Sequence, residues 1–443
     1  MDGIPRGMPG EPTGDEVRTS ETSVEDRASP RRPVGFGFIA AYTLAYTGVW
    51  MALATPAFLS LALKIRQVHS EGATGSLSLV LGIGAFIAVV ANPFFGRLSD
   101  RTTSRFGMRR PWVLGGMVFG TIGLLIIAIA RNVPMILVGW CVAQLSFNAL
   151  LAAMVALLPD QVPVEQRGRV AGLFGIGLPI GLVGGAFLAQ AVSGSIFLMF
   201  MAPAAAGVAF VLILATILDD RRLDPSHRPP PYTLREFLGS FWVNPVRHPD
   251  FGWAWLSCFL LNMGVAILIT YQVFYLTDHL GITQERVPRL VFITLLVLNA
   301  GLVVFSVVGG SLSDLAGGRR KIFIWSSAFV FGVGTAIIAF AGSFDAFLVG
   351  VAICGIGLGI YLAVDLALVS QVLPNPDDAS KDLGVFNIGN ALPYSLAPAI
   401  APIFLSIPLF ASGEGGNYTA LYFVAALFSI AGALAILPVK GVR

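Results

Sequence analysis

The chain alternates long apolar runs with short polar segments from residue 35 onward. Each run is about 20 residues or longer, the length with which an α-helix crosses the hydrocarbon core of a bilayer. Strands of a membrane β-barrel would be shorter and would alternate apolar and polar positions, so the pattern predicts helices. The predicted spans are approximately residues 35–60, 75–96, 112–130, 134–158, 169–191, 195–217, 251–276, 287–309, 321–342, 345–372, 384–408 and 418–438.

The order of the spans indicates a duplicated unit. Gly-Arg-Leu-Ser-Asp at 96–100 returns as Gly-Ser-Leu-Ser-Asp at 310–314, an offset of 214 positions, and Leu-Pro at 178–179 returns with the same offset at 392–393. Two landmarks with one offset indicate two copies of one structural unit. We therefore predict an all-α integral membrane protein with twelve spans in two pseudo-symmetric halves, 35–217 and 251–443. The repeated prolines Pro179 and Pro393 should kink their helices.

The polar segments have different predicted structures. Residues 1–34 are rich in Pro, Gly and Ser and lack the apolar core of a signal peptide, so they are predicted to be a disordered tail. The segment 218–250 joins the halves. Within it, Thr233 and Glu236 match a capping box, and apolar residues follow on one helical face, which predicts a short helix on the membrane surface.

Composition and charge agree with a membrane protein and predict its orientation. Hydrophobic residues make up 56% of the chain and charged residues 12%, about half of the usual soluble share. Of the 28 Lys and Arg residues, 23 fall in segments that lie on one side if the N-terminus is cytoplasmic. The positive-inside rule therefore places both termini and the 218–250 linker in the cytoplasm of a plasma-membrane protein. The net charge of +3 reflects this topology and predicts no nucleic-acid partner. The five Lys and Arg residues that fall on the other side of the membrane are Lys64, Arg66, Arg131, Arg286 and Arg289.

The loop after the second span carries a motif of glycine, aspartate and arginine. A carboxylate at this helix end can meet neighbouring arginines and the positive N-terminus of another helix, and such a cluster could hold the halves together as a gate. The alternative is that the basic loops only set the orientation of the chain. The candidate gating residues of the two copies are Gly96, Asp100, Arg101, Gly107, Arg109, Arg110, Asp314, Arg319 and Arg320.

With two six-helix halves, a central linker and this motif, the chain resembles the major facilitator superfamily. The longer loop, Ser99 to Pro111, and the segment from Leu383 to Pro393 are similar to the sucrose and glycoside–cation symporters. The resemblance implies a transporter that alternates between inward-open and outward-open states, with a gating role for the motif aspartate. One departure matters. Gln144 falls where sucrose transporters carry a proton-handling acid, and Val155 falls at the place of an arginine, while Asn148 matches. The sucrose–proton mechanism therefore cannot be transferred.

Asp365 is the clear ionisable residue at depth within the predicted spans. A carboxylate there is costly, so it is a functional candidate, and Tyr361 lies one turn earlier on the same face. Three roles remain open for Asp365: proton or cation coupling, contact with a solute, or a hydrogen bond that joins helices.

Polar and aromatic residues in mid-span provide candidates for a solute site between the halves. Amides suit sugar hydroxyl groups and aromatic rings suit the apolar faces of a sugar, although such residues also join helices or line membrane interfaces. The candidates are Tyr46 and Trp50, with Tyr42 on the same face, and Gln144, Asn148, Asn262, Tyr271, Gln272, Asn387 and Asn390.

The predicted function is secondary active transport of a small polar organic solute such as a sugar or glycoside, coupled to protons or another cation, by a monomer in a lipid bilayer. The alternatives are an exporter of amphipathic cations and a non-transporting sensor. No cofactor, metal site or enzyme activity is predicted, since Cys141, Cys258 and Cys354 lie in apolar spans without ligand spacing and no nucleophile–base pair is evident.

Overall fold

The computed structural model describes residues 33–223, 245–315, 319–373, 379–407 and 416–440. Most of the predicted tail and the predicted linker helix lie outside these residues. In the N-terminal half the helices are α2 (Phe36–Thr55), η1 (Pro56–Ser60), α3 (Leu61–Val68), α4 (Ala73–Asp100), α5 (Arg110–Ile129), α6 (Val133–Gln161), α7 (Val164–Ala191) and α8 (Ile196–Ile217). In the C-terminal half they are α10 (Pro249–Phe274), η3 (Tyr275–His279), α11 (Val287–Leu315), α12 (Arg320–Ala339), α13 (Phe344–Val372), α14 (Ala379–Ala391), α15 (Pro393–Leu405) and α16 (Tyr418–Ala435).

The described residues contain twelve helices that are long and apolar enough to cross a membrane, as predicted. The first span of each half is longer than predicted, because a π-helical turn continues it: η1 and α3 extend α2 to Val68, and η3 extends α10 to His279. The eleventh span is broken, with α14 ending at Ala391 and α15 beginning at Pro393. By contrast, α7 runs through Pro179 without a break.

Glycine lets the helices of each half approach closely, and it does so at similar helix contacts in the two halves. A Cβ added to Gly123 on α5 would lie 2.7 Å from the carbonyl oxygen of Gly139 on α6. In the other half, a Cβ on Gly334 of α12 would lie 2.7 Å from the carbonyl oxygen of Gly350 on α13. Small residues at such crossings are the usual means of packing membrane helices. The shared arrangement supports the duplication seen in the sequence.

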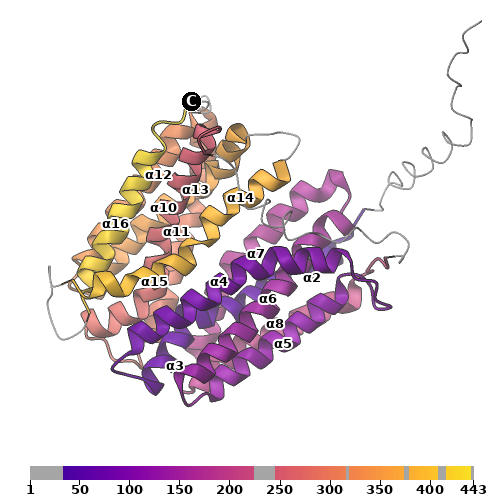
Figure 1. Cartoon of the computed structure of the whole chain (residues 1–443), viewed down its shortest axis with the longest axis horizontal. Coiled ribbons are helices and arrows are strands. Elements are labelled where there is room, and N and C mark those ends of the chain that lie inside the picture. The colour runs from indigo at the N-terminus through magenta and orange to yellow at the C-terminus, as the bar shows by residue number, and fades with distance from the viewer. Residues whose placement is uncertain (1–32, 224–244, 316–318, 374–378, 408–415, 441–443) are drawn as a thin grey trace, which may run out of the picture.

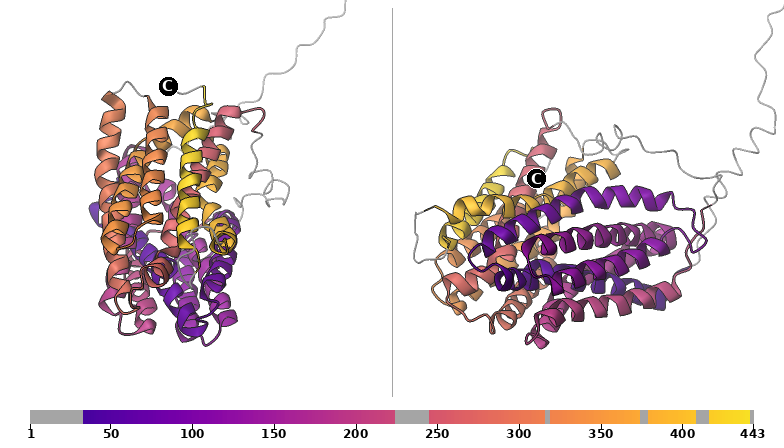
Figure 2. Two further views of the ribbon diagram at one scale, coloured as in Figure 1. Left: turned by 90° about the vertical axis from the view of Figure 1, so that its left-hand side faces the viewer. Right: turned by 60° about the horizontal axis from the view of Figure 1, so that its bottom comes forward.

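We call the end of the bundle that carries the 101–109 loop and residues 218–223 the basic end. We call the opposite end, which carries the 69–72 and 280–286 connections, the sealed end. Helix α4 packs extensively against α15 of the other half and only slightly against α14, and α7 packs against α11. In Figure 1, α4 and α15 lie side by side, while α14 leans away from the N-terminal half. The right-hand view in Figure 2 shows the N-terminal helices as one block beside the C-terminal helices.

Candidate functional site

A polar cluster joins three helices of the C-terminal half. Asn262 on α10 donates from Nδ2 to Oδ1 of Asn390 on α14 over 3.0 Å, and the same oxygen accepts from the Cys258 thiol over 3.1 Å. Asp365 and Tyr361 of α13 interact electrostatically with Cys258 across the α10–α13 contact. The structure therefore brings together four predicted residues, Asp365, Tyr361, Asn262 and Asn390, and adds Cys258.

Within the part of the chain that the structure describes, Asp365 and Tyr361 lack partners that buried polar side chains usually have. Asp365 is half-buried and takes part in none of the ion pairs found among the described residues. Tyr361 is 8% exposed, and its hydroxyl forms no hydrogen bond of good geometry with the described residues. A buried hydroxyl without a partner is costly, so the hydroxyl's position beside Asp365 and Cys258 calls for a functional explanation.

Aromatic rings form the corresponding surface of the N-terminal half. Tyr46 stacks on Phe174 of α7 with 3.7 Å between ring centroids, and Trp50 meets Tyr46 edge-on at 6.1 Å. The Trp50 indole nitrogen is buried without a partner among the described residues. Tyr46 and Phe174 lie about three helical turns from the basic end, a depth similar to that of Cys258 and Asn390. Tyr42 is fully buried and donates to the carbonyl of Met154 over 2.7 Å, so it joins α2 to α6.

The remaining candidates lie elsewhere. Gln144 and Asn148 are buried on α6 and bond to one another over 3.0 Å. Tyr271 is fully buried at the contact between the halves, where its hydroxyl meets Ser78 Oγ at 2.7 Å and the Pro398 carbonyl at 3.3 Å. Gln272 is also buried and donates to a carbonyl of its own helix, and Asn387 is exposed on α14, one turn from Asn390 toward the basic end.

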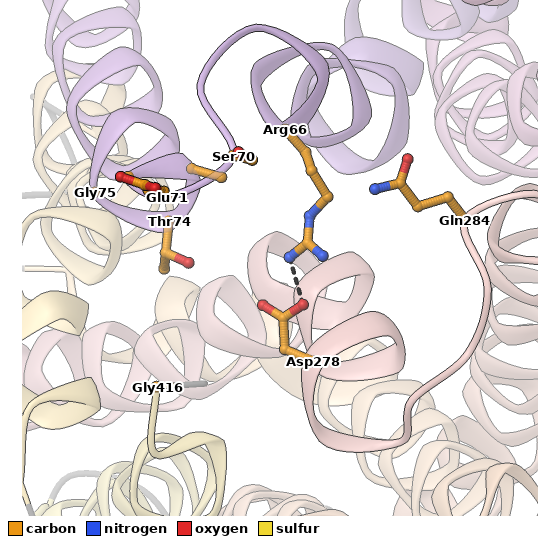
Figure 3. Close-up of a pocket in the computed structure, with 10 residues that line it drawn as sticks. Arg66, Ser70, Glu71, Thr74, Gly75, Asp278, Gln284 and Gly416 are labelled. Atoms are coloured by element: carbon orange, nitrogen blue, oxygen red, sulfur yellow. Dashed lines mark hydrogen bonds and ion pairs between the residues drawn. The ribbon is translucent and has the colours of Figure 1, made fainter. Parts of the chain in front are cut away.

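The sealed end carries an ion pair between the halves that the sequence did not suggest. Arg66 at the end of α3 contacts Asp278 in η3 at 2.5 Å, and Tyr418 donates to the other Asp278 oxygen over 2.9 Å. Figure 3 shows Arg66 and Asp278 facing each other across a pocket that Thr74 also lines. The Arg66 guanidinium also lies 4.9 Å from the centre of the Phe274 ring. Both partners of the pair are about four-fifths buried, so solvent screens it only in part.

At the basic end the loop motif forms a network within the N-terminal half. Arg109 is 4% exposed and pairs with Asp100 at 2.6 Å and Asp160 at 2.8 Å. Asp100 thus meets an arginine of its own motif, while its role as a gate stays a prediction. The carboxylate at the start of α5 is Asp220, whose Oδ2 accepts from the backbone N–H groups of Arg109 and Arg110 over 2.7 and 2.6 Å. Asp220 fits there because it neutralises the positive end of α5.

The other motif residues have less defined surroundings. Gly107 has φ +107°, and a Cβ there would lie 2.2 Å from the Asp220 carboxylate, so glycine is required. Arg110 donates to the Leu218 carbonyl, while Gly96 and Arg101 are partly buried. In the second copy, Arg320 donates to the Ala367 carbonyl over 2.7 Å and Arg319 is exposed; the Asp314 side chain is outside the described residues.

Sequence reasoning missed Cys258, Phe174, Asp220 and the Arg66–Asp278 pair. Cysteine and phenylalanine do not stand out in an apolar span, and Arg66 and Asp278 fall just beyond the predicted spans. Among the described residues there is no group of three or more metal-ligating side chains.

The comparisons with known proteins agree with the fold. The profile of the Major Facilitator Superfamily matches residues 36–398 and 290–442. The structure is similar to that of a mutant of the nucleoside transporter NupG (TM-score 0.72, 12% identity, covering 91% of this chain and 99% of that one). It is also similar to a D-xylose–proton symporter (TM-score 0.68, 14% identity, 92% and 98%).

Matches to curated sequences are short. Multidrug resistance protein 3 of Bacillus subtilis (strain 168) is 28% identical over 136 residues, 28% of this chain and 26% of that protein. Sucrose transport protein SUC3 of Arabidopsis thaliana is 25% identical over 146 residues, 28% and 25% of the two chains. The uncharacterized symporter sll1374 of Synechocystis sp. is 54% identical over 39 residues, 9% and 7%. The matched segments span about a quarter or less of these relatives. The match of the family profile across nearly all of the helical region, together with the twelve-helix fold, shows that the chain belongs to the major facilitator superfamily.

Proposed function

We propose that the protein is a secondary active transporter of a small polar organic solute, with sugars and glycosides first, and that Asp365 carries the coupled proton. The observation that carries this proposal is a carboxyl group within a membrane span, beside the buried Tyr361 hydroxyl and without an ion-pair partner among the described residues. A carboxyl group in that setting is stable when protonated and can release the proton to water when the site opens. One chain supplies both halves of the site, so we propose a monomer.

The charge distribution supports an orientation. The basic end carries most of the lysine and arginine residues, which favours the cytoplasmic side of the plasma membrane for this end and both termini. In that orientation the two halves meet near the outside, through α4 with α15 and Arg66 with Asp278, while α14 leans away from the N-terminal half toward the cytoplasm. The Arg66–Asp278 pair then serves as part of the outer gate. The inner gate forms when the two halves approach each other at the basic end, and Asp100 and Arg109 then exchange ion-pair partners.

The solute site lies between the aromatic surface of the N-terminal half and the amide cluster of the C-terminal half. Tyr46 and Trp50 offer flat apolar faces, while Asn262, Asn387 and Asn390 offer hydrogen-bonding groups for hydroxyls. Gln144 and Asn148 bond to one another here and would have to exchange partners to bind a solute, and Tyr271 and Gln272 would have to become accessible as the halves move. The names of a sucrose transport protein and a D-xylose–proton symporter among the similar proteins support a sugar-like solute.

The test is solute-driven proton movement in sealed vesicles that contain the purified protein. A panel of sugars and glycosides is added to wild type and to Asp365→Asn. One solute should drive proton uptake in wild type, and the variant should lose this uptake by at least about tenfold. Equal proton movement in both proteins would remove Asp365 from coupling. Solute movement without any proton movement would make the protein a facilitator or direct attention to another ion.

Export of amphipathic cations is the second candidate. It is favoured by the match to a multidrug resistance protein and by an acidic residue at a depth similar to that of the aromatic rings. In the same vesicles, cationic dyes would then exchange with protons while sugars would not. Asp365→Asn would abolish dye binding itself, whereas under the symport proposal it removes only proton movement.

A further inference from the structure

A line of polar groups runs from Asp365 on α13 through α10 to α14. The Tyr361 hydroxyl lies beside the Asp365 carboxyl and the Cys258 thiol, without a hydrogen bond of good geometry to a described residue in this structure. The thiol in turn donates to Asn390 Oδ1 over 3.1 Å, and Asn262 Nδ2 donates to that same oxygen over 3.0 Å. Four side chains thus connect the candidate proton site to the helix that precedes the break in the eleventh span.

The end of this line lies at a joint. Asn390 is the residue before Ala391, where α14 ends, and α15 begins at Pro393. Besides Asn390, α14 is attached to α10 by the Trp255 indole, which donates to the Val385 carbonyl over 3.0 Å. By contrast, α15 packs against α4 of the other half. The hydrogen bonds between α10 and α14 therefore determine the orientation of α14 relative to the sealed end.

The hydroxyl and the thiol each have one hydrogen to donate, so the line has a direction. If Asp365 is ionised, the Tyr361 O–H donates to the carboxylate, and the Tyr361 oxygen is free to accept the Cys258 S–H. If Asp365 is protonated, its own O–H donates to the Tyr361 oxygen. The Tyr361 O–H then donates to the Cys258 sulfur, and the thiol hydrogen is left for Asn390.

We propose that Cys258 and Asn390 are positioning residues that transmit the protonation of Asp365 to α14. The thiol bond adds to the Asn262 and Trp255 bonds and holds α14 more tightly against α10 when the carboxyl is protonated, and its loss loosens α14 when the carboxyl is ionised. The proton comes from water and forms an O–H bond on Asp365, and no other covalent bond changes. The inference rests on the proposed role of Asp365 as the proton site, and it adds how a bound proton alters the basic end.

Other titratable groups near the line are few in the described residues. Tyr394 on α15 interacts with Cys258. Arg320 of α12 reaches α13 at the Ala367 carbonyl, a bond to the backbone. On α14, Asp382 lies two turns from Asn390 toward the basic end and is buried. On α11, which packs on α13, Arg289 lies near the sealed end. Asp365 is thus the group whose titration acts directly on Tyr361.

The experiment measures the opening of the basic end against pH, without any solute. Spin labels are placed at Leu98→Cys on α4 and Gly384→Cys on α14, both exposed positions. The parent protein also carries Cys141→Ala and Cys354→Ala. Cys258 is 1% exposed and stays unlabelled, which mass spectrometry checks. Because Cys354 is a buried thiol bonded to a carbonyl outside the line, its removal is the matched control, and the parent should behave as a protein with Cys354 restored does.

The parent should shift its distance distribution between about pH 5 and about pH 8, with populations changing about tenfold. Asp365→Asn should show the low-pH distribution throughout. Cys258→Ala and Asn390→Ala should lose the pH dependence, whereas Cys258→Ser, which keeps one donor, should retain it. Thermal unfolding of each variant shows whether it is folded.

The outcomes separate this inference from the proposed function. If Cys258→Ala and Asn390→Ala both respond to pH as the parent does, while Asp365→Asn does not respond, then the line does not transmit the proton and the inference is wrong. If Asp365→Asn still responds to pH, or the parent never does, Asp365 is not the proton site and the proposed function fails first.

Discussion

At the scale of single residues, two buried tyrosines of the C-terminal half make a useful contrast. The Tyr275 hydroxyl lies 2.6 Å from the Ile338 carbonyl and 2.9 Å from the Ala341 carbonyl, so it binds the end of α12. The Tyr361 hydroxyl is buried without such a bond among the described residues. One hydroxyl therefore contributes to stability, while the other is explained by its position beside Asp365.

Tyr361→Phe should therefore cost less stability than Tyr275→Phe, and it should reduce solute-driven proton movement at least about tenfold. Tyr275→Phe should lower stability by about 1 kcal/mol through the lost hydrogen bonds and keep the proton-to-solute ratio. Thermal unfolding in detergent and the vesicle assay measure the two quantities. A Tyr361→Phe protein that is markedly less stable and still fully coupled would assign this hydroxyl a structural role.

Part of the site could be predicted residue by residue. Asp365, Tyr361, Asn262 and Asn390 are polar residues within apolar runs, and such residues need a reason to be there. Cys258 has no such signal, since a buried thiol is ordinary in a core. Tyr271 is also a polar residue within an apolar run, but it lies outside the polar cluster. Its hydroxyl meets Ser78 of the other half, a partner 193 positions away in the sequence. Polarity within a span thus indicates a polar partner but does not say which one.

At the scale of elements, the first helix of each half reaches farther than its apolar run. Polar residues suggested an end near 60, yet the helix continues through Lys64 and Arg66. Lys64 donates to the Ala128 carbonyl over 2.9 Å and so binds the C-terminal end of α5, as Tyr275 does for α12. A cation at a helix C-terminus is favourable, so the contact replaces part of the hydration of the ammonium group. The length of the apolar run alone therefore does not predict where the first helix ends.

Arg66→Ala should weaken the closure of the sealed end. The pair is about four-fifths buried, but Asp278 keeps the hydrogen bond from Tyr418 after Arg66 is removed, so the loss should cost about 1 kcal/mol and shift the population toward an open sealed end by about fivefold. Fluorescence energy transfer between dyes at Ser193→Cys and Gln284→Cys, one on each half, measures the opening. Arg286→Ala removes an equal charge from an exposed site of the same end and should have no effect.

The reversed pair, Arg66→Asp with Asp278→Arg, should restore closure in part, because the attraction is kept while Tyr418 loses its carboxylate acceptor. If Arg286→Ala opens the sealed end as much as Arg66→Ala does, net charge and not the contact between the halves controls closure.

At the scale of the whole molecule, the repeat predicted the two halves and their helix count, because each copy carries its own apolar pattern and motif. The placement of one half against the other was not predictable. It depends on single contacts such as Arg66 with Asp278 and Phe187 with Phe292, whose rings lie 5.7 Å apart. These residues are distant in sequence and fall at different points of the two copies. The conformation is therefore set by pairs that no repeat reveals.

The orientation and the open end can be tested together. Asn387 is exposed on α14, between the basic end and the polar cluster. In a chain with Cys141→Ala, Cys258→Ser and Cys354→Ala, Asn387→Cys should react with a membrane-impermeant thiol reagent at least about tenfold faster from the cytoplasmic side than from outside. Thr283→Cys, exposed in the connection at the sealed end, is the matched control and should react from outside.

Labelling in right-side-out and inside-out vesicles, read by mass spectrometry, distinguishes the possibilities. If Asn387→Cys reacts from outside and Thr283→Cys from inside, the charge argument for orientation is wrong. If Asn387→Cys is silent from both sides while Thr283→Cys reacts, the protein rests in the membrane with its basic end closed. Where the basic end is open, addition of a transported solute should slow the cytoplasmic reaction of Gly384→Cys, an exposed position of α14 outside the proposed solute site, because closing the basic end around the solute covers α14.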